Sequence, residues 1–167
     1  MAELKDLTDL LYHEIQVLYD AEKLLLAAIP RMAEKAKDPD LKAALLVHLE
    51  ETKVHKDRLE QVADLLDINP DGDKSPSMKG LIAESEKVMH KDATPEALDA
   101  ALICGAQKVE HYEIAGYGTA AHIALGLGYD EVHRILYKTL QEEQATDTKL
   151  NNLAKGAINR KAAQAEA

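Results

Sequence analysis

Two glutamates, Glu110 and Glu113, lie on a predicted helical face that otherwise carries no charge. Residues three and four apart share one face of a helix, so this face also carries Ala106, Tyr117 and Ala120. Such an apolar face is normally buried, and burying a carboxylate is unfavourable unless it is paired, protonated or bound to a metal ion. The pattern therefore indicates a buried site that needs protons or cations.

Three further predicted helices each place a glutamate on or beside the inward face, at a level compatible with this pair. Hard first-row cations prefer carboxylate and imidazole ligands, and bridging carboxylates can hold two ions together. One inward carboxylate on each of four helices gives a charge of −4, which two divalent ions would neutralise. The sequence thus predicts a two-metal site with the ligands Glu22, Glu51, Glu110 and Glu143, and with His55, Glu113 and Asp147 as further ligands.

This prediction depends on the coincidence of the four carboxylates and not on any one of them. A single inward glutamate is more often half-exposed or ion-paired than a metal ligand, and a single histidine such as His55 is more often an ordinary core or surface residue. His48 lies on the same helical face as His55. His48 is either a hydrogen-bond donor to the ligands of the site or a structural residue at the boundary of the core.

The spacing of apolar residues predicts four long helices, over residues 4–37, 38–66, 94–126 and 130–155. Residues 67–93 form a long connection with a short helix at 77–91. This connection can run back along the second helix, which is on the order of 40 Å long at about 1.5 Å per residue. We therefore expect an all-α, ferritin-like four-helix bundle with one long crossover. Residues 1–160 should form a single domain, and residues 161–167 a frayed C-terminal tail.

The composition excludes several classes of protein. The formal charge is −10 and no basic stripe is present, which argues against a nucleic-acid partner. Cys104 is the single cysteine, so the chain forms no internal disulfide and no four-cysteine metal site. The first residues are charged, with no apolar signal segment, and no apolar run approaches the length of a membrane span. We expect a cytoplasmic protein that does not associate with membranes.

Four segments, at residues 18–23, 48–52, 107–119 and 145–147, closely resemble the YciE/YciF family of bacterial stress-associated proteins. The resemblance extends over nearly the whole chain. It implies a fold of the ferritin-like superfamily, related to rubrerythrin and bacterioferritin, with a two-metal centre and assembly as a homodimer. Glu22, the pair Glu110 and Glu113, and Glu143 match the glutamate ligands of the first, third and fourth helices of that superfamily.

The chain also departs from the superfamily pattern at two positions. His55 ends a Glu-x-x-His motif whose glutamate is replaced by Thr52, so Glu51 is expected to substitute. Thr146 replaces the histidine of the fourth helix, with Asp147 beside it. A site with fewer imidazoles leaves two iron ions or two manganese ions as alternatives. No Cys-x-x-Cys motif is present, so the electron donor is unknown.

Two functions from different classes remain open at this point. The first is a di-metal, expected to be di-iron, carboxylate protein that reacts with O2 or peroxide during stress. The second is a structural or metal-holding helical dimer with no turnover, so the sequence leaves open whether the chain is an enzyme. Iron storage would need a shell of many subunits, for which the sequence gives no indication.

Overall fold

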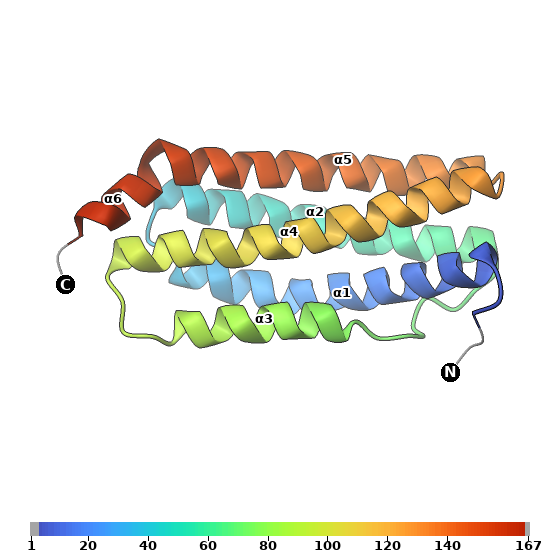
Figure 1. The fold of residues 1–167 in the computed structure, drawn as a ribbon, viewed down its shortest axis with the longest axis horizontal. Helices are drawn as coiled ribbons and strands as arrows, with labels where there is room; N and C mark the ends of the chain where they lie inside the picture. Colours follow the sequence, from blue (N-terminus) through green and yellow to red (C-terminus); the bar gives the residue numbers. More distant parts are fainter. Residues whose placement is uncertain (1–3, 166–167) are drawn as a thin grey trace.

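Four long helices lie side by side, as the apolar spacing predicts (Figure 1). The computed structural model describes residues 4–165. Its elements in order are α1 (Leu7–Lys35), α2 (Pro39–Leu66), α3 (Pro76–Met89), α4 (Pro95–Gly126), α5 (Asp130–Leu153), a π-helical turn (Ala154–Ile158) and α6 (Asn159–Gln164). Helix α1 pairs with α2 and helix α4 with α5, and the two hairpins pack through α1 with α4 and α2 with α5.

The first four helices begin at residues whose side chains cap them. Asp6, Asp38, Ser75 and Thr94 each accept hydrogen bonds from backbone N–H groups in the first turn of α1, α2, α3 and α4. Proline follows the cap in α2, α3 and α4. At this position a backbone N–H would have no acceptor within the helix, so proline costs no hydrogen bond. The caps therefore fix the starts of the helices close to the predicted positions.

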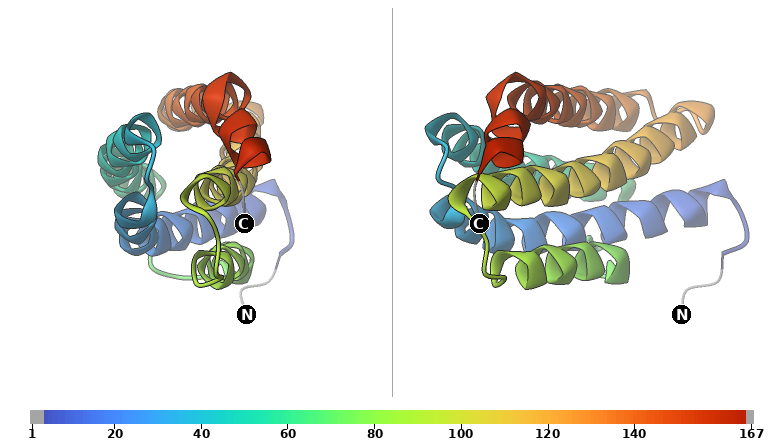
Figure 2. Two further views of the ribbon diagram at one scale, coloured as in Figure 1. Left: turned by 90° about the vertical axis from the view of Figure 1, so that its left-hand side faces the viewer. Right: turned by 60° about the vertical axis from the view of Figure 1, so that its left-hand side comes forward.

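The connection between the hairpins runs along the length of the bundle. Helix α2 ends and helix α4 begins at opposite ends of the molecule, and α3 lies against α1 and α4 between them (Figures 1 and 2). This confirms the ferritin-like topology with one long crossover and a short extra helix. Within residues 4–165, no helix combines the length and apolar character that a membrane span needs.

The C-terminal segment, for which the sequence predicts a frayed tail from residue 161, is helical as far as Gln164. The π-helical turn redirects the chain, buries Ile158 and continues into α6, so residues 161–164 are helical (Figure 2). Lys161 Nζ lies 3.3 Å from Asp38 Oδ2 at the start of α2. This contact joins the segment to the start of α2. Residues 166–167 lie outside the described part of the chain.

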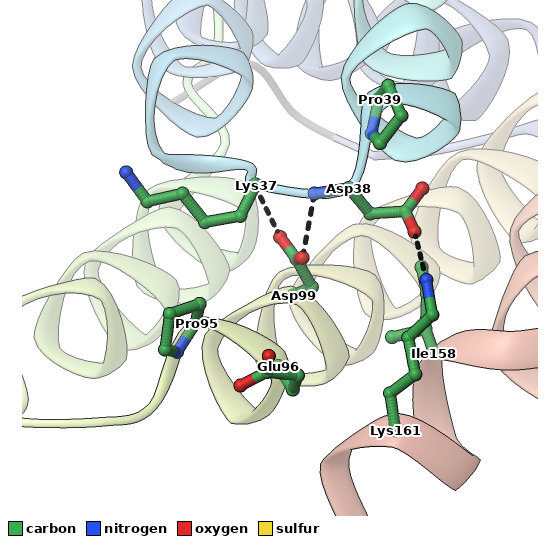
Figure 3. A pocket seen from close by; sticks show the side chains of 8 residues that line it. All are labelled: Lys37, Asp38, Pro39, Pro95, Glu96, Asp99, Ile158 and Lys161. Atoms are coloured by element: carbon green, nitrogen blue, oxygen red, sulfur yellow. Dashed lines mark hydrogen bonds and ion pairs between the residues drawn. The ribbon is translucent and has the colours of Figure 1, made fainter. Parts of the chain in front are cut away.

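Asp99 on α4 joins the same end of the bundle to the turn between α1 and α2 (Figure 3). Its carboxylate accepts hydrogen bonds from the backbone N–H groups of Lys37, at 2.7 Å, and Asp38, at 2.8 Å. The residue is 5% exposed, and a cavity of about 160 Å³ lies beside it. One buried carboxylate thus satisfies two N–H groups that α1 and α2 leave without helical partners.

Replacing Asp99 by alanine should lower the free energy of unfolding by roughly 2–4 kcal/mol, because two backbone donors lose a charged acceptor. The measurement is urea unfolding followed by circular dichroism. Glu96→Gln is the control, since Glu96 lines the same cavity and should change stability by less than about 1 kcal/mol. Equal effects of the two substitutions would show that Asp99 does not hold this turn.

The hydrophobic core is divided into two clusters along the bundle. One contains buried residues such as Leu25, Leu45 and Leu150, and the other contains residues such as Leu11, Leu59 and Leu136. On α2, α4 and α5 the buried apolar positions of the two clusters are separated by inward-facing polar residues. On α1 the clusters meet between Leu18 and Ala21, and the buried Glu22 follows directly. The core is therefore interrupted at one level by a polar layer.

Candidate metal centre

The polar layer in the middle of the core consists of carboxylates, imidazoles and one hydroxyl. All four long helices contribute, and every member is at most 4% exposed. The residues are Glu22 from α1; His48, Thr52 and His55 from α2; Glu110 and Glu113 from α4; and Glu143 from α5. Spacings of three, four and seven residues place them on the inward faces of their helices.

Two groups of possible ligand atoms lie next to each other in this layer. The first group is His48, Glu110, Glu113 and Glu143, and the second is Glu22, His55 and Glu143. Within each group, one ligand atom from each residue lies within 4.8 Å of the others. Glu143 belongs to both groups, so its carboxylate would be shared between two adjacent ion positions.

The imidazoles face the carboxylates at short distances. His48 Nε2 lies 3.2 Å from Glu110 Oε1. His55 Nδ1 lies 2.7 Å from Glu143 Oε1 and 3.6 Å from Glu22 Oε1. Each histidine thus presents one ring nitrogen to one of the two groups.

Neighbouring side chains hold two of these residues in place. His55 Nε2 lies 2.9 Å from Glu142 Oε2, and Arg58 donates two hydrogen bonds to the same carboxylate, at 2.5 and 3.0 Å. Metal-binding histidines usually have such a partner on the other ring nitrogen, which fixes the orientation of the ring. Tyr117 Oη donates a hydrogen bond of 2.5 Å to Glu22 Oε1.

Many atoms of this layer have no hydrogen-bond partner. In residues 4–165, ten buried side-chain nitrogen and oxygen atoms make no hydrogen bond, and all ten belong to the seven residues of the layer. Two of them, His55 Nδ1 and Glu143 Oε1, face each other at 2.7 Å as an ion pair without the geometry of a hydrogen bond. A buried polar atom without a partner costs about 1–3 kcal/mol. The arrangement is therefore unfavourable for the protein alone and suits groups that bind a cation.

Burial changes the protonation of the carboxylates. It raises the pKa of Glu22 to about 8, and the negative charge of Glu143 adds to the rise. It also raises the pKa values of Glu110 and Glu113 well above the ordinary value, and the charges of neighbouring glutamates add to the effect. Without a metal ion, burial therefore favours the protonated form of these three carboxyl groups.

His55 and Glu143 shift in opposite directions because they form an ion pair. Burial lowers the pKa of His55, but the carboxylate of Glu143, 2.7 Å from Nδ1, outweighs burial and raises it to about 9. Burial raises the pKa of Glu143, but the nearby imidazoles of His55 and His48 outweigh burial and lower it below its ordinary value. The shared carboxylate is thus ionised and available as a ligand.

Five of the seven predicted ligands come together in the structure, and two do not. Glu22, His55, Glu110, Glu113 and Glu143 all lie in the two groups. The structure does not bring Glu51 into either group: its side chain is 37% exposed, and its Oε2 lies 3.8 Å from His48 Nδ1. Consecutive helical residues point about 100° apart, and Thr52 takes the inward position.

Asp147 also lies outside the two groups. Its carboxylate accepts a hydrogen bond from Gln107 Nε2 at 3.2 Å and lies 3.4 Å from His111 Nε2 at the surface. His48 takes part instead, and it supplies the second imidazole that the site was expected to lack. The seven-residue spacing between His48 and His55, two turns of helix, is the sequence signal that could have identified it.

The donor set fits first-row transition metals. Four carboxylates and two imidazoles are the ligands that iron and manganese take in helical bundles. No sulfur donor is present in the two groups, which argues against metals that prefer thiolates.

Comparison with known proteins places the chain in a family. Residues 6–163 match the family described as Domain of unknown function (DUF892). The chain is 41% identical over 160 residues to protein YciF of Escherichia coli strain K12, a match that covers 95% of this chain and 96% of YciF.

Solved structures agree with this assignment. The crystal structure of the E. coli stress protein YciF matches with a TM-score of 0.89 and 41% identity, over 93% of this chain and 99% of that one. YcfI from Rhodopseudomonas palustris, proposed to be a structural protein, matches with a TM-score of 0.86 and 42% identity, over 89% and 95% of the two chains. A Xanthomonas campestris protein with 21% identity, TM-score 0.71 and coverage of 92% and 94% supports the fold alone. The chain therefore belongs to the YciF (DUF892) family and has the ferritin-like fold.

Proposed function

We propose that this chain binds two first-row transition-metal ions, iron or manganese, in the centre of the bundle. The observation that carries the proposal is the pair of ligand groups that share Glu143, with nine buried carboxylate and imidazole atoms that make no hydrogen bond. Glu22, His55 and Glu143 would hold one ion. His48, Glu110, Glu113 and Glu143 would hold the other.

The charges of the site support this proposal. The four buried carboxylates carry a charge of −4 when they are ionised, and two divalent ions would neutralise them. The ions would compete with protons, whose binding to Glu22, Glu110 and Glu113 burial favours. The unfavourable burial of these groups in the metal-free protein thus favours metal binding.

We propose further that the loaded protein reacts with O2 or peroxide during stress. Bound ions of this kind can bind and reduce oxidants at an open position. In this chain the two apolar clusters exclude water from both sides of the site. Tyr117 holds Glu22, and Glu142 with Arg58 orients His55.

A second candidate is a metal-holding structural protein with no turnover. The nearly complete burial of the site favours it, as does the proposed structural role of the R. palustris relative. In either case we propose a cytoplasmic homodimer. Exposed apolar side chains on α2, those of Leu46, Val47 and Val54, support pairing with a second copy.

Elemental analysis of protein purified without chelators should give close to two equivalents of iron or manganese per chain. Less than about half an equivalent of every transition metal, unchanged after anaerobic reconstitution, would contradict the two-metal proposal. The ferrous protein should then consume O2 or peroxide faster than free iron in the same buffer. If iron is bound but is oxidised no faster than in buffer, the structural candidate is correct.

A further inference from the structure

Thr52 is the member of the polar layer that metal binding alone leaves unexplained. It is 0% exposed, and its Oγ1 has no hydrogen-bond partner. The other nine unpartnered atoms are carboxylate oxygens and imidazole nitrogens, which metal ions would satisfy. A neutral hydroxyl is one donor and one acceptor, and it needs a hydrogen-bond partner.

The helix itself does not supply this partner. Threonine and serine in a helix can donate to the carbonyl oxygen four residues earlier. Thr148 does so with Gln144, at 2.9 Å, and Ser85 does so with Leu81, at 3.0 Å. Thr52 makes no such bond, so its hydroxyl is free to interact with a molecule in the site.

The position of Thr52 indicates which kind of molecule fits. It follows His48 by four residues and precedes His55 by three, so it lies on the same face of α2 between the two histidines. Each histidine belongs to a different ligand group. The carboxylates come from α1, α4 and α5, so the α2 side of the site offers imidazoles and a hydroxyl but no carboxylate within the two groups.

We propose that Thr52 is the hydrogen-bond donor of a binding site for a small anion, of the size of hydroxide or hydroperoxide, on the α2 side between the two ion positions. This inference rests on the two-metal proposal above. The anion must be small because every surrounding residue is at most 4% exposed. The positive ions would attract it, and Thr52 Oγ1–H would donate to it, as a charge-assisted hydrogen bond.

The test uses the protein loaded with Co²⁺, whose visible spectrum reports ligand binding, and azide as the probe anion. Thr52→Val removes the hydroxyl and keeps the branched shape, whereas Thr52→Ser keeps the hydroxyl. All forms should bind two Co²⁺ ions. The dissociation constant of azide should rise on the order of tenfold in Thr52→Val, as expected for one lost charge-assisted hydrogen bond, and should stay within about twofold in Thr52→Ser.

Two controls separate this effect from a change in structure. Thr148→Val removes a hydroxyl that the helix already satisfies, and it should leave azide affinity unchanged. In the metal-free protein, Thr52→Val should melt no lower than the wild type, since it removes a buried hydroxyl that has no partner.

Each result has a distinct meaning. If wild type binds no metal ion, the two-metal proposal itself fails. If wild type binds two Co²⁺ ions but does not bind azide, or if Thr52→Val binds azide as well as wild type, only the anion site is wrong. A loss of Co²⁺ from Thr52→Val would also overturn the inference, because the hydroxyl would then be a metal ligand.

Discussion

Replacing Glu143 by glutamine should remove both metal ions together. Glu143 is the residue that the two ligand groups share, so one substitution weakens both positions. Loss of a hydrogen-bond partner outside the ligand shell already lowers metal affinity by about 10–100-fold, so loss of a bridging ligand should lower it by roughly 100-fold or more. The measurement is metal content after equilibrium dialysis against a buffered metal solution.

Glu51→Gln is the matched control for this experiment. It makes the same chemical change at a glutamate that the sequence predicts as a ligand and that the structure places at the edge of the site. It should retain two ions, with affinities within a few-fold of wild type. If Glu51→Gln loses metal as completely as Glu143→Gln, Glu51 moves into the site on binding, and the ligand groups described above are incomplete.

The metal-free protein should lose stability as the pH rises from about 5 to about 9. The pKa of Glu22 is about 8 in the folded chain against an ordinary value of 4.5, so the folded state binds more protons than the unfolded state in this range. Stability then falls as the pH rises through it. His55, with a pKa of about 9 against 6.5, acts in the same direction at the upper end of the range. The pKa of Glu143 is lowered, so its contribution is lost only in acid, below this range.

Bound metal should counteract this loss of stability at high pH. Ions compete with protons for the same atoms, so the stability gained from metal increases with pH. The free energy of unfolding should change by several kcal/mol, since each pKa unit corresponds to about 1.4 kcal/mol. The melting temperatures with and without metal should nearly coincide at pH 5 and differ by roughly 10 °C at pH 8. Equal melting curves at pH 8 would contradict a buried metal site.

The sequence predicted the architecture well because the relevant signals are local. The apolar spacing and the caps at Asp38 and Thr94 lie within single helices, so they locate α2 and α4 closely. The length of the connection at residues 67–93 then predicts one long crossover between the two hairpins. The sequence gives no local signal for α6, because that helix follows a π-helical turn and contacts Asp38, which is distant in sequence, through Lys161.

Candidate ligands on a clearly apolar helical face could be identified from the sequence, whereas those on an ambiguous face could not. Glu22, Glu110 and Glu143 lie within strongly apolar faces, and the structure buries all three. Residues 51 and 52 are consecutive, so a rotation of about 100° decides which of them faces inward. The sequence alone favoured the carboxylate, whereas packing of α2 against α5 turns Thr52 inward and leaves Glu51 partly exposed.

The division of the ligands between the two hairpins has a consequence for assembly. The α1–α2 hairpin carries Glu22, His48 and His55, and the α4–α5 hairpin carries Glu110, Glu113 and Glu143. Neither hairpin carries a complete ligand group, so metal binding as proposed would have to follow the docking of the two halves. Once loaded as proposed, the ions act as cross-links between halves that the chain connects only through the α3 crossover. The supply of metal in the cell would then set how firmly the two halves of the bundle hold together.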